Sequence, residues 1–213
     1  MQALDKISLG TNWILLVLVF LFVIIAILKI IDAEKLKGYV FALFNKGFIE
    51  SEAEEDILFF SSFYNLLFVF SATVLALTVS LLASEINVAF SLTFSSFLSV
   101  LKLVFSYLIV KRFLELAFAR LLLIKKQVRF FLVCKLSYLY SISFFLLVFY
   151  ILFLFSPLNY FYFTVIILGL FTLRYLFLLT NNKKLVFSEL FYFILYICAF
   201  EIAPLLTLFK LMI

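Results

Sequence analysis

The stretch WILLVLVFLFVIIAILKII, residues 13–31, decides the fold class, because Lys29 is its only charged residue. A helix needs on the order of 20 apolar residues to cross a bilayer, and this stretch supplies nearly that number. A secretory signal peptide would have a shorter apolar core followed by a small-residue cleavage site. Here Lys29 is followed by Ile30, Ile31 and Asp32 instead. We therefore expect a membrane-spanning helix that the protein retains.

The rest of the chain has the same character, since 68% of its 213 residues are hydrophobic and only 14% are charged. Soluble domains are about half apolar and about a quarter charged, and a soluble domain of this length could not cover so much apolar surface. Six segments could each cross a bilayer, namely residues 11–31, 57–82, 88–110, 132–155, 158–180 and 187–212. The prediction is an all-α fold: a single domain over residues 1–213 that forms a polytopic membrane bundle of about six transmembrane helices, with further helices at the cytoplasmic membrane interface.

Lysine and arginine are unevenly divided between the two sides of this bundle. Most of those outside the spans fall in the loops after the first, third and fifth segments, whereas only Lys6 and Lys210 fall on the opposite side. Cytoplasmic loops are enriched in lysine and arginine. The bias therefore predicts that both termini lie outside the cytoplasm, in the periplasm if the protein is bacterial.

Two of the cytoplasmic stretches have the pattern of surface helices. In residues 111–129, KRFLELAFARLLLIKKQVR, most basic side chains fall on one helical face, which is typical of a helix lying on anionic lipid headgroups. The basic residues of that face are Lys111, Arg112, Lys125, Lys126 and Arg129. The alternative is that the third spanning helix continues into the cytoplasm and packs on the protein itself. In residues 33–44, AEKLKGYVFALF, an apolar face is formed by Leu36, Tyr39, Val40 and Leu43.

An acidic run, ESEAEED, follows at residues 50–56. Ser51 and Glu54 have the spacing of a capping box, and carboxylates are favoured at a helix N-terminus. The run therefore predicts the start of the second spanning helix. A docking patch for a basic partner is the alternative.

The third segment carries a polar stripe inside the membrane. Its members recur every three or four residues and so share one face of a helix: Ser91, Ser95, Ser99, Lys102 and Ser106. Small hydroxyl residues at this spacing let two helices approach closely, so the stripe predicts a helix-packing seam. A lysine at the centre of lipid costs roughly 2.5–3.5 kcal/mol, and Lys102 should therefore face protein or water.

Depth in the membrane indicates which polar groups could meet. Lys102 and Asn65 both lie roughly 12 Å from the cytoplasmic end of their spans, and Glu201 lies roughly 22 Å from the same side. We therefore expect Lys102 to pair with Asn65, with Glu201 as a more distant partner. Arg174 and Glu189, at roughly 9 Å and 3 Å, form the second expected pair.

Glu201 is followed by Pro204, which lacks a backbone N–H and so leaves the carbonyl of Phe200 without its helical partner. The sequence predicts a kink and a small polar pocket there, because lipid offers no hydrogen bonds. The pocket could be an ion or proton site, or a contact with a partner subunit. Alternatively, a buried pair or a protonated Glu201 fixes the packing of the helices.

Several kinds of chemistry are disfavoured by the composition. The chain has no histidine, which removes histidine-ligated haem, the usual zinc sites and histidine general bases. It has only four glycines and no nucleotide motif. Its two cysteines suggest neither a disulfide framework nor a zinc site. We expect no enzymatic activity, no metal, no cofactor and no nucleic-acid partner.

The C-terminal string FYFILYICAFEIAPLLTLFKLM, residues 191–212, resembles the end of a family of integral membrane proteins from Bacteroidota that is known only as a domain of unknown function. The shared pattern is Tyr-x-Cys-x-x-Glu-Ile-x-Pro-Leu-Leu with a closing lysine, here Tyr196, Cys198, Glu201, Ile202, Pro204, Leu205, Leu206 and Lys210. Lys102 matches a mid-chain lysine, and Ala203 stands where the pattern has leucine. The resemblance implies the inner membrane of a bacterium with two membranes, and it implies no activity.

These observations predict a non-catalytic subunit of a larger envelope or secretion-type complex in the inner membrane, packed through polar helix seams. Its expected partners are other membrane protein subunits and anionic lipid headgroups at the cytoplasmic face. The alternative is a small ion- or proton-coupled transporter or channel that uses Glu201 and Lys102.

Overall fold

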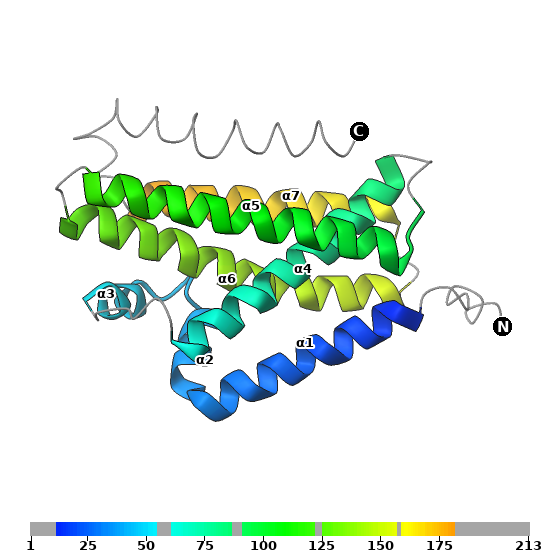
Figure 1. Cartoon of the computed structure of the whole chain (residues 1–213), viewed down its shortest axis with the longest axis horizontal. Coiled ribbons are helices and arrows are strands. Elements are labelled where there is room, and N and C mark those ends of the chain that lie inside the picture. Colours follow the sequence, from blue (N-terminus) through cyan, green and yellow to red (C-terminus); the bar gives the residue numbers. More distant parts are fainter. Residues whose placement is uncertain (1–11, 55–60, 87–90, 122–124, 157–158, 182–213) are drawn as a thin grey trace.

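The structure of this protein is a computed structural model that describes residues 12–54, 61–86, 91–121, 125–156 and 159–181. These residues form α-helices and contain no strand (Figure 1), so the predicted all-α fold is confirmed. The helices are α1 (Asn12–Ile31), α2 (Ala33–Val40), α3 (Lys46–Glu54), α4 (Ser62–Ile86), α5 (Phe94–Leu121), α6 (Lys125–Phe155) and α7 (Tyr160–Asn181).

Five of the described helices are long and apolar enough to cross a membrane: α1, α4, α5, α6 and α7. The chain is therefore a multi-pass membrane protein. Each of these helices overlaps one of the first five predicted segments, with differences at the ends, since α4 is described from Ser62 and α5 from Phe94. The sixth predicted segment, residues 187–212, lies outside the described residues.

The helices α5 and α6 are longer than a bilayer requires. With 28 and 31 residues, they measure roughly 42 Å and 46 Å, whereas the hydrocarbon core is about 30 Å thick. Figure 1 shows both reaching past the end of α1 that leads into α2. Lys111 lies inside α5, which continues to Leu121, and Lys125 begins α6. The predicted separate surface helix over 111–129 is therefore wrong, and the alternative of a continued spanning helix holds for α5.

The short helices α2 and α3 pack against this extended end of the bundle (Figure 1). The predicted apolar face of residues 33–44 is confirmed, because Leu36, Tyr39 and Leu43 are buried and Val40 is partly buried. That face is covered by protein, since α2 contacts both α1 and α6. The hydroxyl of Ser141 in α6 fixes the contact by donating a 2.7 Å hydrogen bond to the backbone carbonyl of Val40.

The centre of the bundle is formed by α4 and α6. In an 18-residue apolar stretch of each helix, 72% and 61% of the residues are buried in α4 and α6, against 22% in α5 and in α7. Both central helices carry buried hydroxyl residues that bond to carbonyls of their own backbone: Ser71, Thr73, Thr78 and Ser80 in α4, and Ser143 in α6. The two helices contact each other, and Phe70 of α4 stacks on Phe144 of α6 with 4.6 Å between ring centroids.

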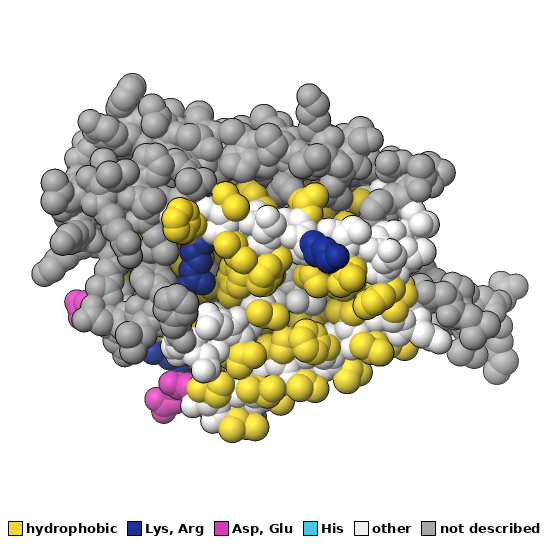
Figure 2. All heavy atoms as spheres, viewed as in Figure 1, with side chains coloured by type: hydrophobic (Ala, Val, Ile, Leu, Met, Phe, Trp, Pro, Cys, Tyr) yellow, Lys and Arg dark blue, Asp and Glu magenta, His cyan; other side chains and the backbone are white. Residues whose placement is uncertain are grey.

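The outer helices present apolar side chains to their surroundings. Exposed examples are Leu16 and Ile30 in α1 and Phe161 in α7, at 68%, 84% and 72%. Figure 2 shows apolar side chains spread over α1 and its neighbours, with the visible acidic side chains at the end of the bundle that carries α2 and α3. This distribution fits a bundle surrounded by lipid.

Candidate functional site

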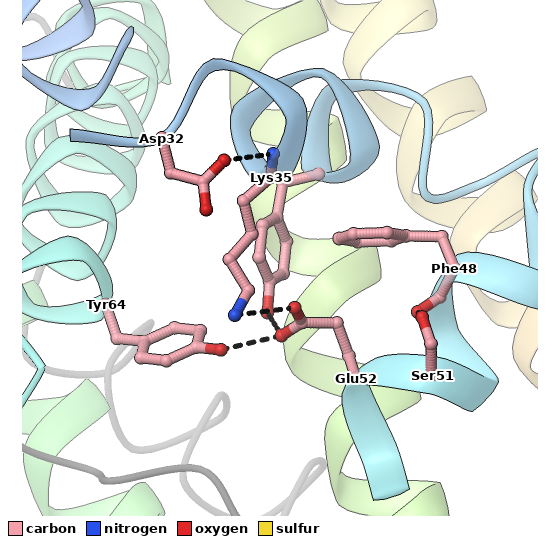
Figure 3. Close-up of polar contacts among 7 residues, drawn as sticks. Asp32, Lys35, Phe48, Ser51, Glu52 and Tyr64 are labelled. Carbon is pink, nitrogen blue, oxygen red and sulfur yellow. Dashed lines mark hydrogen bonds and ion pairs between the residues drawn. The ribbon is translucent and has the colours of Figure 1, made fainter. Parts of the chain in front are cut away.

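Glu52 of α3 is only 2% exposed, and its carboxylate has three polar partners among the described residues. One of its oxygens accepts hydrogen bonds from the hydroxyls of Tyr39, at 2.6 Å, and Tyr64, at 2.7 Å. The other oxygen lies 3.1 Å from Nζ of Lys35. These side chains come from α2, α3 and α4 and converge on Glu52 (Figure 3). We call Lys35, Tyr39, Glu52 and Tyr64 the Glu52 cluster.

Two members of the Glu52 cluster are positioned by the start of α2. Asp32 is the N-cap of this helix, and its carboxylate accepts a 2.8 Å hydrogen bond from the backbone N–H of Lys35 (Figure 3). An N-cap of this kind satisfies an otherwise unpaired donor of the first turn. Lys35 and Tyr39 are four residues apart and therefore lie on the same face of α2. The cap thus fixes the direction from which both side chains reach Glu52.

A close contact between α2 and α3 holds Glu52 in place. Asn45 precedes α3, and its side-chain oxygen accepts a 3.2 Å hydrogen bond from the backbone N–H of Phe48. The ring of Phe48 then lies against Gly38 of α2, where an added Cβ would come within 2.2 Å of the ring. Only glycine leaves room for this approach. It brings Glu52, one turn after Phe48, next to Tyr39.

Aromatic rings surround the Tyr39 end of the cluster. The ring of Tyr39 has neighbours at 5.1–6.2 Å between centroids: Phe48, Phe63, Tyr64 and Tyr140. Burial first, and then the nearby Glu52 carboxylate, raise the pKa of Tyr39 far above its ordinary value. Tyr39 therefore keeps its proton and remains a hydrogen-bond donor to Glu52.

The Glu52 cluster is suited to holding helices together and not to catalysing a reaction. A carboxylate that accepts two hydroxyl hydrogen bonds and pairs with an ammonium group has its charge compensated. Within the described part of the chain, no group of three or more His, Cys, Asp or Glu side chains could hold a metal ion. The arrangement ties α2 and α3 to α4, and nothing in it offers a free nucleophile or base.

A second buried polar site joins α6 to α7. Arg174 is 6% exposed and Lys135 is 2% exposed. The Nη2 of Arg174 donates a 3.2 Å hydrogen bond to the backbone carbonyl of Lys135. The guanidinium also lies 5.8 Å from the centroid of the Tyr175 ring. The predicted partner of Arg174, Glu189, lies outside the described residues, so the structure does not test this pair.

The predicted polar stripe of α5 lies on an exposed face of the described structure. Ser91 precedes α5, and Ser95, Ser99, Lys102 and Ser106 are all exposed, whereas Phe97, Val100, Val104 and Leu108 form the buried face. Among the described residues α5 buries apolar side chains and the stripe forms no packing seam, so the seam stays a prediction. No hydrogen bond or ion pair joins Lys102 to Asn65, which is also exposed, or to any other described residue. The structure does not bring this expected pair together.

The predicted basic face is only partly described. Lys111 is half-buried, and its Nζ donates a 3.3 Å hydrogen bond to the hydroxyl of Tyr107. Arg112 is also half-buried and lies over the ring of Phe68, 5.7 Å from its centroid. These two residues thus contact their own protein, and this contact differs from the predicted exposure to lipid. The side chains of Lys125, Lys126 and Arg129 lie outside the described part.

The predicted polar pocket around Glu201 and the kink at Pro204 also lie outside the described residues. The transporter alternative depends on Glu201 and Lys102, of which only Lys102 lies in the described residues, so this alternative stays a prediction. The capping prediction at Ser51 is wrong. Ser51 lies inside α3, where its hydroxyl donates to the carbonyl of Phe48 at 2.8 Å.

Sequence reasoning missed the Glu52 cluster, although a signal was present. Glu52 follows Ile49 by three residues, so the two share a helical face, and both are buried. Glu50 and Glu54 fall on the other side of α3 and are exposed. Treating ESEAEED as one acidic run hid the single carboxylate that shares the apolar face.

A family model described as Domain of unknown function (DUF4271) matches residues 14–212. No curated protein and no solved structure matches the chain. The resemblance to a family known as a domain of unknown function is therefore confirmed at that level, while the Bacteroidota origin and the C-terminal pattern stay predictions.

Proposed function

Because the chain belongs to the family described as Domain of unknown function (DUF4271), whose description gives no activity, we propose a function from the geometry. The protein is a non-catalytic subunit of a larger complex in the inner membrane of a bacterial envelope. It binds a different membrane protein through the polar stripe of α5, formed by Ser95, Ser99, Lys102 and Ser106.

One observation carries this proposal: Lys102 is exposed in the middle of a membrane span. The span of α5 runs from Phe94 to Phe113, so Lys102 lies roughly 12 Å from one end and 16 Å from the other. A lysine at such depth is unfavourable in lipid by roughly 2.5–3.5 kcal/mol. The described residues give it no partner, and the cost is removed if another helix supplies an acceptor.

The shape of the stripe also fits a helix partner. Ser95, Ser99 and Ser106 flank Lys102 on the same face, and side chains of this size let two helices approach closely. The hydroxyl of Ser99 already donates to the carbonyl of Ser95 at 3.1 Å, so Ser99 needs no acceptor from a partner. The main requirement on a partner is a group that accepts from the Lys102 ammonium, such as a carboxylate or an amide oxygen.

A second copy of this chain is a poor occupant of the same face. A two-fold interface uses the same patch on both subunits and would bring two Lys102 side chains together. Two like charges in a low-dielectric environment repel strongly. The partner is therefore a different protein with an acidic or amide side chain at mid-membrane depth.

The lysine-rich end of the bundle supports the proposed orientation, with both termini in the periplasm. Lysine and arginine are retained on the cytoplasmic side of inner-membrane proteins. This orientation would place the basic residues of that end on the side of the anionic cytoplasmic headgroups.

Site-specific photocrosslinking in native membranes tests the proposal. A benzophenone amino acid replaces Ser99 on the polar stripe, and a matched control variant carries it at Phe161, an exposed apolar position of α7. We expect a discrete adduct with a second membrane protein from position 99 and none from position 161. Adding Lys102→Leu to the Ser99 variant should remove the adduct.

Two results would overturn the proposal. One is an adduct at position 99 that contains only lipid. The other is an internal adduct in which position 99 is joined to a peptide from residues 182–213 of the same chain. Either result would leave the polar stripe without a protein partner.

A further inference from the structure

The turn between α2 and α3 displays two phenylalanines outside the membrane spans. Phe41 and Phe44 are 50% and 69% exposed, and neither lies in a described helix that could cross a membrane. Exposed rings of this size are unfavourable in water, because the driving force for burial grows with the apolar area. Their exposure therefore calls for an apolar environment.

The backbone of the turn places both rings on one side. The carbonyl of Phe41 accepts hydrogen bonds from the N–H groups of Phe44, at 2.9 Å, and Asn45, at 3.1 Å, which is the bonding of a helical turn. Residues three apart in such a turn are neighbours. Ala42 and Leu43, which lie between the two rings in sequence, are buried in the core. The turn thus packs one apolar side on the protein and carries the rings on the other.

Phe44 lies level with the end of a membrane span. Its ring meets the ring of Phe177 in α7, with 5.9 Å between centroids. The span of α7 ends at Thr180, so Phe177 lies roughly 5 Å inside that end. Phe44 is therefore placed where the hydrocarbon of the bilayer gives way to the headgroups.

The outer side of the turn continues a lipid-facing surface of α7. Leu173 precedes Phe177 by four residues and so shares its face. Leu173 and the neighbouring Leu176 are 46% and 57% exposed, and exposed leucines within a span face the acyl chains. Because Phe44 packs at the end of this surface, the environment that fits Phe44 is the same lipid.

A basic side chain completes the pattern. Lys37 is exposed and precedes Phe41 by four residues, so the two lie on the same face. A lysine can lay its aliphatic stem along apolar surface and keep its ammonium among the headgroup phosphates. Helices that lie in a membrane interface combine phenylalanine or leucine with lysine in this way.

We propose that the turn between α2 and α3 is a membrane-interface anchor, in which Phe41 and Phe44 insert among the acyl chains just below the headgroups and Lys37 meets the phosphates. The partner is a lipid surface and not a protein, so the inference goes beyond the proposed function. The anchor holds α2 and α3, and with them the Glu52 cluster, at the bilayer surface. The apolar face predicted for residues 33–44 packs on the protein, and the two phenylalanines make the contact with lipid.

Depth-dependent fluorescence quenching tests the anchor. Trp13 is the only tryptophan of the chain, and its buried indole N–H has no hydrogen-bond partner among the described residues, so Trp13→Phe gives a background without tryptophan and breaks no hydrogen bond there. Phe44→Trp in this background reports the position of the turn. In phosphatidylcholine bilayers we expect a large loss of fluorescence with bromine atoms on the acyl chains close to the headgroup. The loss should be smaller with bromine near the middle of the bilayer, and small with iodide in the water.

Glu50→Trp in the same background is the matched control. The Glu50 side chain is 56% exposed in α3, and a carboxylate at such a position is expected to face water. This reporter should lose fluorescence with iodide and not with brominated lipid. Phe41→Trp is a second reporter of the turn and should behave like position 44.

The wild-type protein allows a measurement that needs no substitution. A phosphatidylcholine with a diazirine on the acyl chain close to the headgroup labels neighbouring side chains on irradiation. Trypsin cleavage after Lys37 and Lys46 then releases residues 38–46. Mass spectrometry should find the lipid adduct on Phe41 or Phe44.

The proposal is overturned if iodide quenches position 44 as strongly as position 50, because the turn then lies in water. Quenching of position 44 by neither iodide nor brominated lipid also overturns it, because protein then covers the rings. Stronger quenching by bromine at the middle of the bilayer, or the absence of a lipid adduct on residues 38–46, has the same meaning.

Discussion

Gly38 of α2 lies directly against the aromatic ring of Phe48 in α3, so closely that a Cβ at position 38 would stand 2.2 Å from Cε2 of that ring. The ring of Phe48 also packs against the ring of Tyr39, at 5.1 Å between centroids, which limits how far it can move. We expect Gly38→Ala to lower the free energy of unfolding. Overpacking at this contact destabilises the fold by about 1–3 kcal/mol. The higher helix propensity of alanine offsets about 1 kcal/mol of that loss. Thermal unfolding in detergent measures the difference.

A matched control is available in α7. A Cβ at Gly169 would meet nothing within 4 Å, so Gly169→Ala should leave the Tm unchanged or raise it slightly. Trimming the ring in the double variant Gly38→Ala with Phe48→Ala should recover part of the loss, because the clash is then gone. A Gly38→Ala variant as stable as wild type would show that the contact between α2 and α3 is loose.

The carboxylate of Glu52 should be worth more to stability than any exposed acid of α3. Glu52→Gln removes the ion pair with Lys35. The one amide oxygen can still accept from both tyrosine hydroxyls, which share one oxygen of Glu52, but these hydrogen bonds then go to a neutral acceptor. Hydrogen bonds to charged groups contribute about 1.5–3 kcal/mol, and Lys35, at 23% side-chain exposure, can turn toward solvent. We expect a loss of about 1–3 kcal/mol, measured by thermal unfolding.

Glu50 provides the comparison for Glu52. Its carboxylate is 56% exposed and pairs with Lys46 at 3.5 Å, and surface pairs of this kind contribute little. Glu50→Gln should therefore unfold at nearly the wild-type temperature. Equal losses from both variants would contradict the assignment of Glu52 as the group that holds these helices together.

The raised pKa of Tyr39 gives a stability that depends on pH in the alkaline range. Below the ordinary tyrosine pKa of 10.0, Tyr39 keeps its proton in both the folded and the unfolded chain, so its full contribution is present. Above that pH the unfolded chain loses the proton and the folded chain does not. Stability should therefore fall as the pH rises past about 10.

The Tyr39→Phe variant isolates this effect. It should be less stable than wild type near neutral pH, because the hydrogen bond to Glu52 is lost, but its Tm should fall less steeply above about pH 10. Tyr162→Phe removes an exposed hydroxyl and should keep the wild-type slope. Parallel slopes for wild type and Tyr39→Phe would count against a buried, protonated Tyr39.

The membrane helices could be predicted from the sequence because one physical property decides them. A long run of apolar residues such as 13–31 is unfavourable in water, and a run of that length is enough to identify a membrane-spanning helix. The ends of α5 and α6 could not be predicted in the same way. Residues 111–121 continue α5 beyond the length that a bilayer needs, and their amphipathic pattern suits a lipid surface and a protein surface equally.

The polar contacts were harder to predict, because they depend on which helices become neighbours. The predicted depths of Lys102 and Asn65 in the membrane are equal, but depth does not determine the direction in which a side chain points. In the structure, α5 turns Val100 and Val104 inward and Lys102 outward. The Glu52 cluster joins residues from three elements, and only the approach of Gly38 to Phe48 brings them together.

The hydrogen bond from Ser141 to Val40 joins residues 101 positions apart and fastens α2 to the centre of α6. Val40 is the last residue of α2, and carbonyls at a helix end lack an intrahelical partner. Ser141→Ala should therefore leave this carbonyl unsatisfied, at a cost of about 1–3 kcal/mol that thermal unfolding will detect. Ser143→Ala is the matched control, since Ser143 bonds the carbonyl of Leu139 in its own helix, which the helix satisfies already. The Tm should fall clearly for Ser141→Ala and only slightly for Ser143→Ala, and the opposite order would show that α2 is held to α6 by its apolar face alone.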